Sequence, residues 1–224
     1  MTHPTDRRAD SARGPLVRAA AHHFAHKPYA LVNLDDVVAE VNVSRGAMYF
    51  HFPSKHALAR AVIDEAEKKG REAAAGVLAN KLSGLETLID LSYLVALLDL
   101  REDLARAGLH LLESIGRVDE LGARSLREVV NALAQIARQA IHEGDIAEGP
   151  DLEDVARLLV STYIGLRHTS DLGTPRQFLS DLEKAWSLLL PGFVNPERMR
   201  YLSQFVHRRT VVALGKVSPQ RDPA

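Results

Sequence analysis

The chain has 224 residues, of which 46% are hydrophobic and 25% charged, as in an ordinary globular protein of one or two domains. It contains no cysteine, which excludes disulfides, thiolate zinc sites, iron–sulfur clusters and cysteine nucleophiles. The most apolar window, residues 85–100, is interrupted by acidic residues and is shorter than the ~20 residues that a membrane helix needs. Residues 1–18 hold no apolar leader segment, so we expect a cytoplasmic protein with no membrane association.

The net charge of −1 conceals a small asymmetry along the chain. Residues 1–56 carry seven Lys or Arg against five Asp or Glu, whereas residues 57–224 carry 21 basic against 24 acidic residues. A mildly basic N-terminal part is compatible with nucleic-acid binding at that end. A difference of this size also arises by chance, so charge alone does not decide the point.

Apolar residues recur at helical spacing along most of the chain, and no run of alternating β-branched residues stands out. The predicted fold is therefore all-α. Proline, glycine and capping residues divide the pattern into predicted helices over about 14–24, 34–41, 44–51, 55–81, 85–100, 101–115, 121–143, 151–171, 176–190 and 196–214. Residues 1–12 and 215–224 are expected to form polar tails, the latter disordered.

The segment 33–51 gives the sharpest local pattern, two short helices joined by a tight turn. Asn33 and Ser44 can each cap the helix that follows them. Asn42, between the two helices, tolerates the left-handed backbone that such a turn requires. The spacing therefore predicts a helix-turn-helix unit.

The second of these helices, residues 44–51, is too short to be stable alone, and its side chains suit contact with DNA. Small residues allow a helix to approach base edges closely, and Arg45 could read a guanine. Ser44, Tyr49 and His51 could hold phosphates. In a helix-turn-helix the second helix enters the major groove, so we expect this helix to do so.

Three segments share a pattern with a known family: Leu16-Val17-Arg18-Ala19-Ala20 with Phe24, Val37-Val38-Ala39, and Val43-Ser44-Arg45-Gly46-Ala47-Met48-Tyr49-Phe50-His51-Phe52-Pro53-Ser54-Lys55 with Leu58. Over residues 13–60 the chain resembles the N-terminal domain of the tetracycline-repressor (TetR) family. The resemblance implies a three-helix DNA-binding domain over 1–56, joined by a long helix to a helical-bundle effector and dimerisation domain over 57–214. It implies DNA contacts by Ser44, Arg45, Gly46, Ala47, Tyr49, His51 and Lys55.

The resemblance also implies a homodimer that binds a palindromic operator in double-stranded DNA. Two helices of the second domain favour dimerisation on their own pattern. The 151–171 helix is apolar on two faces, and the 176–190 helix carries a stripe of large apolar residues at Phe178, Leu179, Leu182, Trp186 and Leu189. We expect these two helices of each subunit to form a four-helix interface.

Segments within 126–145, 185–192 and 200–202 resemble the γ-butyrolactone-receptor branch of the family. That branch places a Trp near the position of Leu126, so the sequence favours another small, apolar effector over a butyrolactone. The candidate ligand-binding residues are Leu126 and the polar groups on otherwise apolar helices, namely Tyr93, Arg106, His110, Tyr163 and His168. Residues of this kind are more often satisfied core or surface residues than ligand contacts. A regulator or adaptor that responds to no small molecule is the alternative function.

Signatures of catalysis are absent from the sequence, which has no Gly-rich phosphate loop, no Gly-x-Ser-x-Gly elbow and no His-Glu-x-x-His. We therefore expect a protein that is no enzyme and needs no cofactor. His22 and His26, four residues apart on one helix, have a spacing that can hold a metal ion. The neighbouring sequence offers no third ligand, so we expect a packed or solvated helix face there and no metal site.

Overall fold

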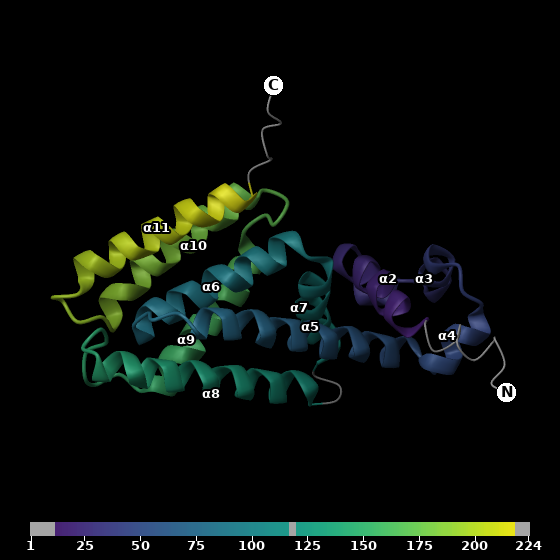
Figure 1. The fold of residues 1–224 in the computed structure, drawn as a ribbon, viewed down its shortest axis with the longest axis horizontal. Coiled ribbons are helices and arrows are strands. Elements are labelled where there is room, and N and C mark those ends of the chain that lie inside the picture. Colours follow the sequence, from purple (N-terminus) through teal and green to yellow (C-terminus); the bar gives the residue numbers. More distant parts are fainter. Residues whose placement is uncertain (1–11, 117–119, 218–224) are drawn as a thin grey trace, which may run out of the picture. The chain divides into compact units, whose positions relative to one another are not determined.

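The computed structural model describes residues 12–116 and 120–217 and shows a helical protein (Figure 1). The helices are α2 (Arg13–His26), α3 (Leu34–Val41), α4 (Arg45–His51), α5 (Lys55–Leu78), α6 (Gly84–Arg101), α7 (Asp103–Ile115), α8 (Leu121–His142), α9 (Leu152–Thr169), α10 (Pro175–Leu189) and α11 (Met199–Val217). Apart from one isolated bridge between Ile146 and Val194, these residues form no β-structure, which confirms the all-α prediction. None of the described helices is long and apolar enough to cross a membrane.

The chain divides into two compact units, each with its own apolar core. The first comprises the described residues up to Glu72 together with Glu102–Ala123, and the second comprises Ala73–Arg101 together with the described residues from Arg124 onward. The helix α7 therefore packs with the N-terminal helices, although it follows α5 and α6 in the sequence. The long helix α5 begins in the first unit and ends in the second.

The core of the first unit forms around α2, whose apolar face is buried along its whole length. Buried side chains of α3, α4, α5 and α7 surround it, among them Val37, Met48, Leu58 and Leu111. A Cβ atom on Gly108 of α7 would lie 2.5 Å from the Cβ of Ala66 in α5, so α5 and α7 cross in direct contact. Together with its extensive packing against α2, this contact holds α7 within the first unit.

The core of the second unit draws on α6, α8, α9, α10 and α11. It takes in the predicted stripe of α10, because Phe178, Leu179, Leu182 and Trp186 are at most 3% exposed within the single chain. The Trp186 indole also donates a hydrogen bond to Ser92 Oγ over 2.8 Å. The expectation that this stripe faces a second subunit is therefore wrong, since the chain's own core already covers it.

Helix boundaries differ from the predicted ones at a few ends. α5 ends at Leu78 instead of residue 81, and α11 continues to Val217, so the first three residues of the predicted tail 215–224 are helical. Ala12, predicted as tail, is buried against the first core. The remaining tail residues, 1–11 and 218–224, lie outside the described residues.

A buried ion pair crosses the second unit between α6 and α9. The Arg167 Nε atom donates to Asp99 Oδ2 over 2.6 Å, and the two side chains are 2% and 0% exposed. The Tyr163 hydroxyl donates to the same carboxylate over 3.1 Å. Burial raises the pKa of Tyr163, and the Asp99 charge raises it further, so the phenol stays protonated. Charges removed from water in this way are stable only as a pair.

Replacing Arg167 with Met leaves the Asp99 carboxylate buried without its cation, and we expect the free energy of unfolding to fall by about 3–5 kcal/mol. Adding Asp99→Leu should restore part of this loss, because it removes the unpaired buried charge, although the Tyr163 hydroxyl then loses its acceptor. Urea unfolding followed by circular dichroism measures both. Arg157→Met is the matched control, because it breaks the exposed pair with Glu153 and should cost at most ~1 kcal/mol. A double variant less stable than Arg167→Met would contradict the account.

Candidate functional site

The α3–turn–α4 unit has the backbone features that the sequence predicts. Asn33 Oδ1 accepts a hydrogen bond from the Asp35 N–H over 3.0 Å, and Ser44 Oγ accepts one from the Ala47 N–H over 3.1 Å. Asn42 ends α3 in the left-handed conformation, with φ of 51°. Two capped helices joined by one left-handed residue form a helix-turn-helix unit.

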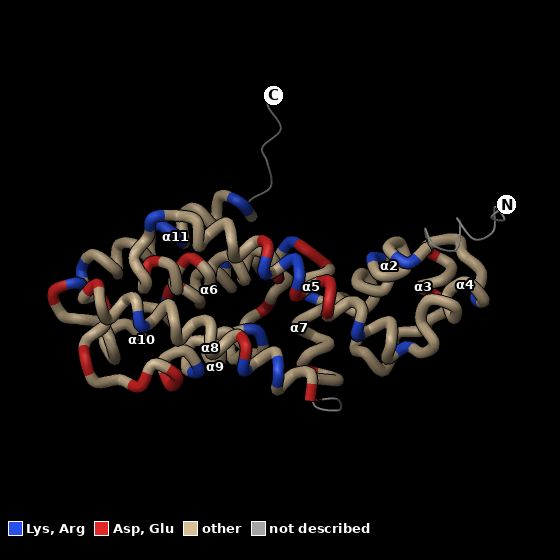
Figure 2. The backbone as a smooth tube through the Cα atoms, turned by 60° about the horizontal axis from the view of Figure 1, so that its bottom comes forward, with Lys and Arg blue, Asp and Glu red and all other residues tan. Residues whose placement is uncertain are grey.

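One face of α4 anchors the helix and the other is open to solvent. Met48, 1% exposed, inserts into the first core, whereas Ser44, Arg45, Gly46, Tyr49 and Phe50 are exposed; we call these five residues the α4 face. Arg45 is basic and no residue of α4 is acidic; Figure 2 marks the basic and acidic positions along the backbone. Ala47 and His51 are half-buried at its margins. A short helix anchored on one side presents its outer residues in a fixed orientation.

Phe50 is the residue of the α4 face that sequence analysis missed. Its side chain is 74% exposed, and its ring centroid lies 5.3 Å from that of His51. A large aromatic side chain gains no stability from exposure to water. In a major groove, apolar side chains contact the methyl groups of thymine. Met48 and Phe50 are both large and apolar, so residue type does not tell which of them is buried. Two residues apart on a helix, they point to different sides, and the helical period could have shown that Phe50 is the exposed one.

Arg45 already has a partner within the chain. Its guanidinium group forms an ion pair with Asp35 of α3, and the side chains are 68% and 47% exposed. The hydrogen bond and the charge of Asp35 raise the pKa of Arg45, so this residue stays a cation. An exposed pair of this kind is weak, so the guanidinium can exchange Asp35 for an external acceptor.

Lys55 makes contacts within the chain that the sequence does not suggest. Its Nζ atom lies 4.7 Å from the Tyr29 ring centroid and donates to the Ala30 carbonyl over 3.2 Å. Partial burial lowers its pKa. The preceding Ser54 caps α5 by accepting from the Ala57 N–H over 3.0 Å. An ammonium group has three N–H donors, so Lys55 can also bind an external acceptor beside the start of α5.

The structure does not bring the six candidate effector residues together in one unit. Arg106 and His110 lie on α7 in the first unit, and the other four lie in the second. Tyr93 is buried and its hydroxyl lies 2.6 Å from Thr210 Oγ1, while Leu126 and His168 are exposed. Sequence analysis missed Asp99, which accepts the Tyr163 hydrogen bond, because it lies on another helix, α6. It also missed Arg167, which lies four residues after Tyr163 on α9 and pairs with the same carboxylate. Tyr163 with this pair forms one polar cluster inside the second core, and Tyr93 with Thr210 forms another.

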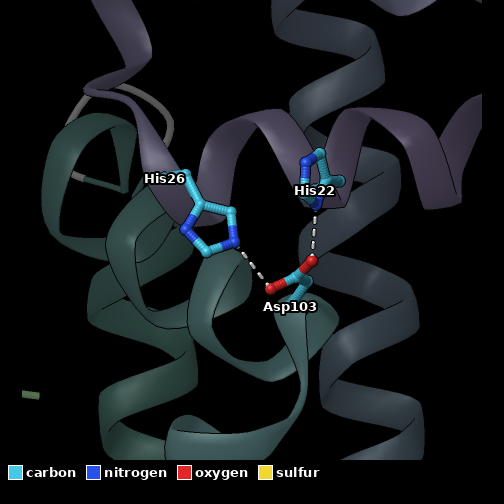
Figure 3. A group of neighbouring side chains, drawn as sticks. All are labelled: His22, His26 and Asp103. Carbon is cyan, nitrogen blue, oxygen red and sulfur yellow. Dashed lines mark hydrogen bonds and ion pairs between the residues drawn. The ribbon is translucent and has the colours of Figure 1, made fainter. Parts of the chain in front are cut away.

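The histidine pair of α2 has a third partner that the sequence did not reveal. Asp103, the first residue of α7, contacts His22 and His26 with its two carboxylate oxygens (Figure 3). The expectation that no third ligand lies near the pair is therefore wrong. Asp103 is distant in sequence and is brought there by the packing of α7 against α2.

The chain matches two family models, "Bacterial regulatory proteins, tetR family" over residues 16–62 and "Tetracyclin repressor-like, C-terminal domain" over residues 82–195. It is 27% identical over 182 residues to the A-factor receptor protein of Streptomyces griseus, a match that covers 81% of this chain and 63% of that protein. The chain thus spans less than two thirds of the length of this relative.

Two solved structures resemble the chain over nearly its whole length. A gamma-butyrolactone receptor, an ArpA-like protein, is 27% identical with a TM-score of 0.77, covering 92% of this chain and 99% of its own. CprB, a TetR family protein from S. coelicolor A3(2), is 27% identical with a TM-score of 0.78, covering 91% and 98%. Since the two models cover both halves of the fold and these structures share it, the chain belongs to the tetR family of bacterial regulatory proteins.

Proposed function

We propose that the chain is a ligand-responsive, dimeric, DNA-binding transcriptional regulator, a repressor that a small apolar effector releases from its operator. The α3–turn–α4 unit carries this proposal, because it is capped at both helices and presents the α4 face to solvent. Such a regulator acts on chromosomal DNA, which places it in the cytoplasm. It needs no cofactor, and we keep the expectation that it is no enzyme.

In this proposal α4 lies in the major groove. Gly46 faces open space, because a Cβ atom there would meet nothing nearer than Ser44 Oγ at 3.8 Å. Since glycine has no side chain, DNA can approach the helix backbone closely at this position. Arg45 leaves Asp35 to pair with a guanine edge, and Phe50 contacts thymine methyl groups. Tyr49 and Lys55 hold phosphates on either side, and the start of α5 adds backbone N–H groups that favour an anion.

A second copy of the chain would cover apolar side chains that one copy leaves exposed. On α9, Leu158 and Ile164 are 45% and 37% exposed, and on α10 Leu188 is 82% exposed. Two copies related by a two-fold axis carry two α4 helices, which then match two half-sites of a palindromic operator. Dimerisation through α9 and the outer side of α10 is thus supported even though the inner stripe of α10 is buried.

The effector is proposed to bind in the second unit, beside Tyr163 and the Asp99–Arg167 pair. The surrounding core is apolar, and a few fixed polar groups in an apolar wall suit a small ligand with one or two hydrogen-bonding atoms. The likeness to gamma-butyrolactone receptors over most of the chain supports a small-molecule effector. Because α5 belongs to both units, it can transmit a shift of the second unit to the DNA-binding helices.

The α4 face is tested by comparing single substitutions in fluorescence anisotropy with operator DNA. Arg45→Ala should cost about 1–3 kcal/mol and relax specificity at one base pair, because a guanine contact is lost. Lys55→Ala should weaken binding to all sequences alike and flatten the salt dependence. Arg124→Ala, which removes another exposed, carboxylate-paired Arg on α8, is the control and should bind like the parent. Parent-like affinity in a folded Arg45→Ala, Tyr49→Ala double variant would refute the assignment.

Dimerisation is tested by introducing charge where the second copy is expected. Leu158→Asp with Ile164→Asp should give monomers in analytical ultracentrifugation, because a stable interface buries at least ~1,200 Å² and tolerates no unpaired charges at its centre. Leu78→Asp changes a residue of similar exposure (54%) at the end of α5 and should leave the dimer intact. A parent protein that is monomeric at micromolar concentration would overturn the proposed dimer.

The effector is tested by a thermal-shift screen of lactones, antibiotics and fatty-acid-like compounds, followed by release of bound operator. A ligand at 100 times its dissociation constant should add about 2.7 kcal/mol of stability. Tyr163→Phe should weaken binding of the hit, since it removes one hydroxyl from the proposed site. If no stabilising compound released DNA, the alternative regulator without small-molecule response would be favoured; if only highly charged compounds did so, the apolar effector would be wrong.

A further inference from the structure

We propose that His22, His26 and Asp103 form a binding site for a divalent transition-metal ion of the zinc class, which joins α2 to α7. The two histidines are four residues apart on α2, and the aspartate begins α7. All three belong to the first unit, so their placement does not depend on the position of the second.

The three side chains already converge on one point (Figure 3). His22 Nδ1 lies 2.7 Å from Asp103 Oδ2, and His26 Nε2 lies 2.9 Å from Asp103 Oδ1. One ligand atom from each residue lies within 4.8 Å of the other two. Ligand atoms around a tetrahedral zinc ion, each ~2.0–2.1 Å from the metal, lie roughly 3.3 Å apart. Small rotations of these side chains therefore suffice to admit an ion.

The donor set selects the kind of ion. Two imidazole nitrogens and one carboxylate oxygen suit zinc, cobalt or nickel, whereas magnesium and calcium take oxygen ligands. The side chains of His22, His26 and Asp103 are 55%, 48% and 39% exposed. The site thus faces solvent, and water can complete the coordination of a three-ligand site.

The two histidines hold the carboxylate in place, because each of them contacts one of its oxygens. Asp103 also lies in the first turn of α7, where the helix dipole favours a negative charge. A metal ion takes the place of the protons that now link the three groups.

Binding is measured with the full-length chain, free of any histidine tag and stripped with a chelator. Co²⁺ is titrated in, followed by its visible absorption, and Zn²⁺ then displaces it. We expect one ion per chain. His26→Gln and Asp103→Asn should each lower the affinity at least ~10-fold, because loss even of an outer-shell partner costs that much. Zn²⁺ should raise the melting temperature of the parent but not of Asp103→Asn.

His207→Gln is the matched control, since it removes another exposed histidine that pairs with a carboxylate, Glu183, over 2.8 Å. Its Co²⁺ affinity should stay within about twofold of the parent value, because two groups alone bind weakly. Circular dichroism without metal checks that every variant is folded. The site is refuted if the parent binds no stoichiometric Co²⁺, or if His26→Gln and Asp103→Asn bind it as tightly as the parent does.

Discussion

The packing of α2 against its neighbours is the interaction on which the rest of the first unit depends. A helix of seven residues such as α4 has no stability of its own in water. Its direction is fixed because Met48 is buried in the core that α2 organises and because Ser44 caps its first turn. The α4 face keeps a single orientation only as long as this core is intact.

The same packing assigns α7 to the first unit, although the family match assigns it to the C-terminal part of the chain. In the sequence it lies within the segment that matches the C-terminal repressor-like model, yet its contacts place it with α2 in the first unit. Asp103 ties its first turn to His22 and His26, and Gly108 lets it cross α5 closely.

Local chemistry was predictable from the sequence, and long-range pairing was not. Asn33, Asn42 and Ser44 act on their own backbone within a few residues, so their roles follow from residue type and spacing alone. The partners of His22 and Tyr163 come from other helices, and no periodicity reveals which helices meet. The partner of the α10 stripe could not be predicted for the same reason, because an apolar face does not tell whether its own chain or a second copy covers it.

If two α4 faces, one from each copy of a symmetric dimer, read DNA together, selection from a random-sequence duplex library with the full-length chain should reveal it. We expect enrichment of an inverted repeat whose half-site centres lie ~10 base pairs or a multiple of that apart, on one face of the duplex. Enrichment of sequences without two-fold symmetry, or no enrichment over the starting library, would contradict it.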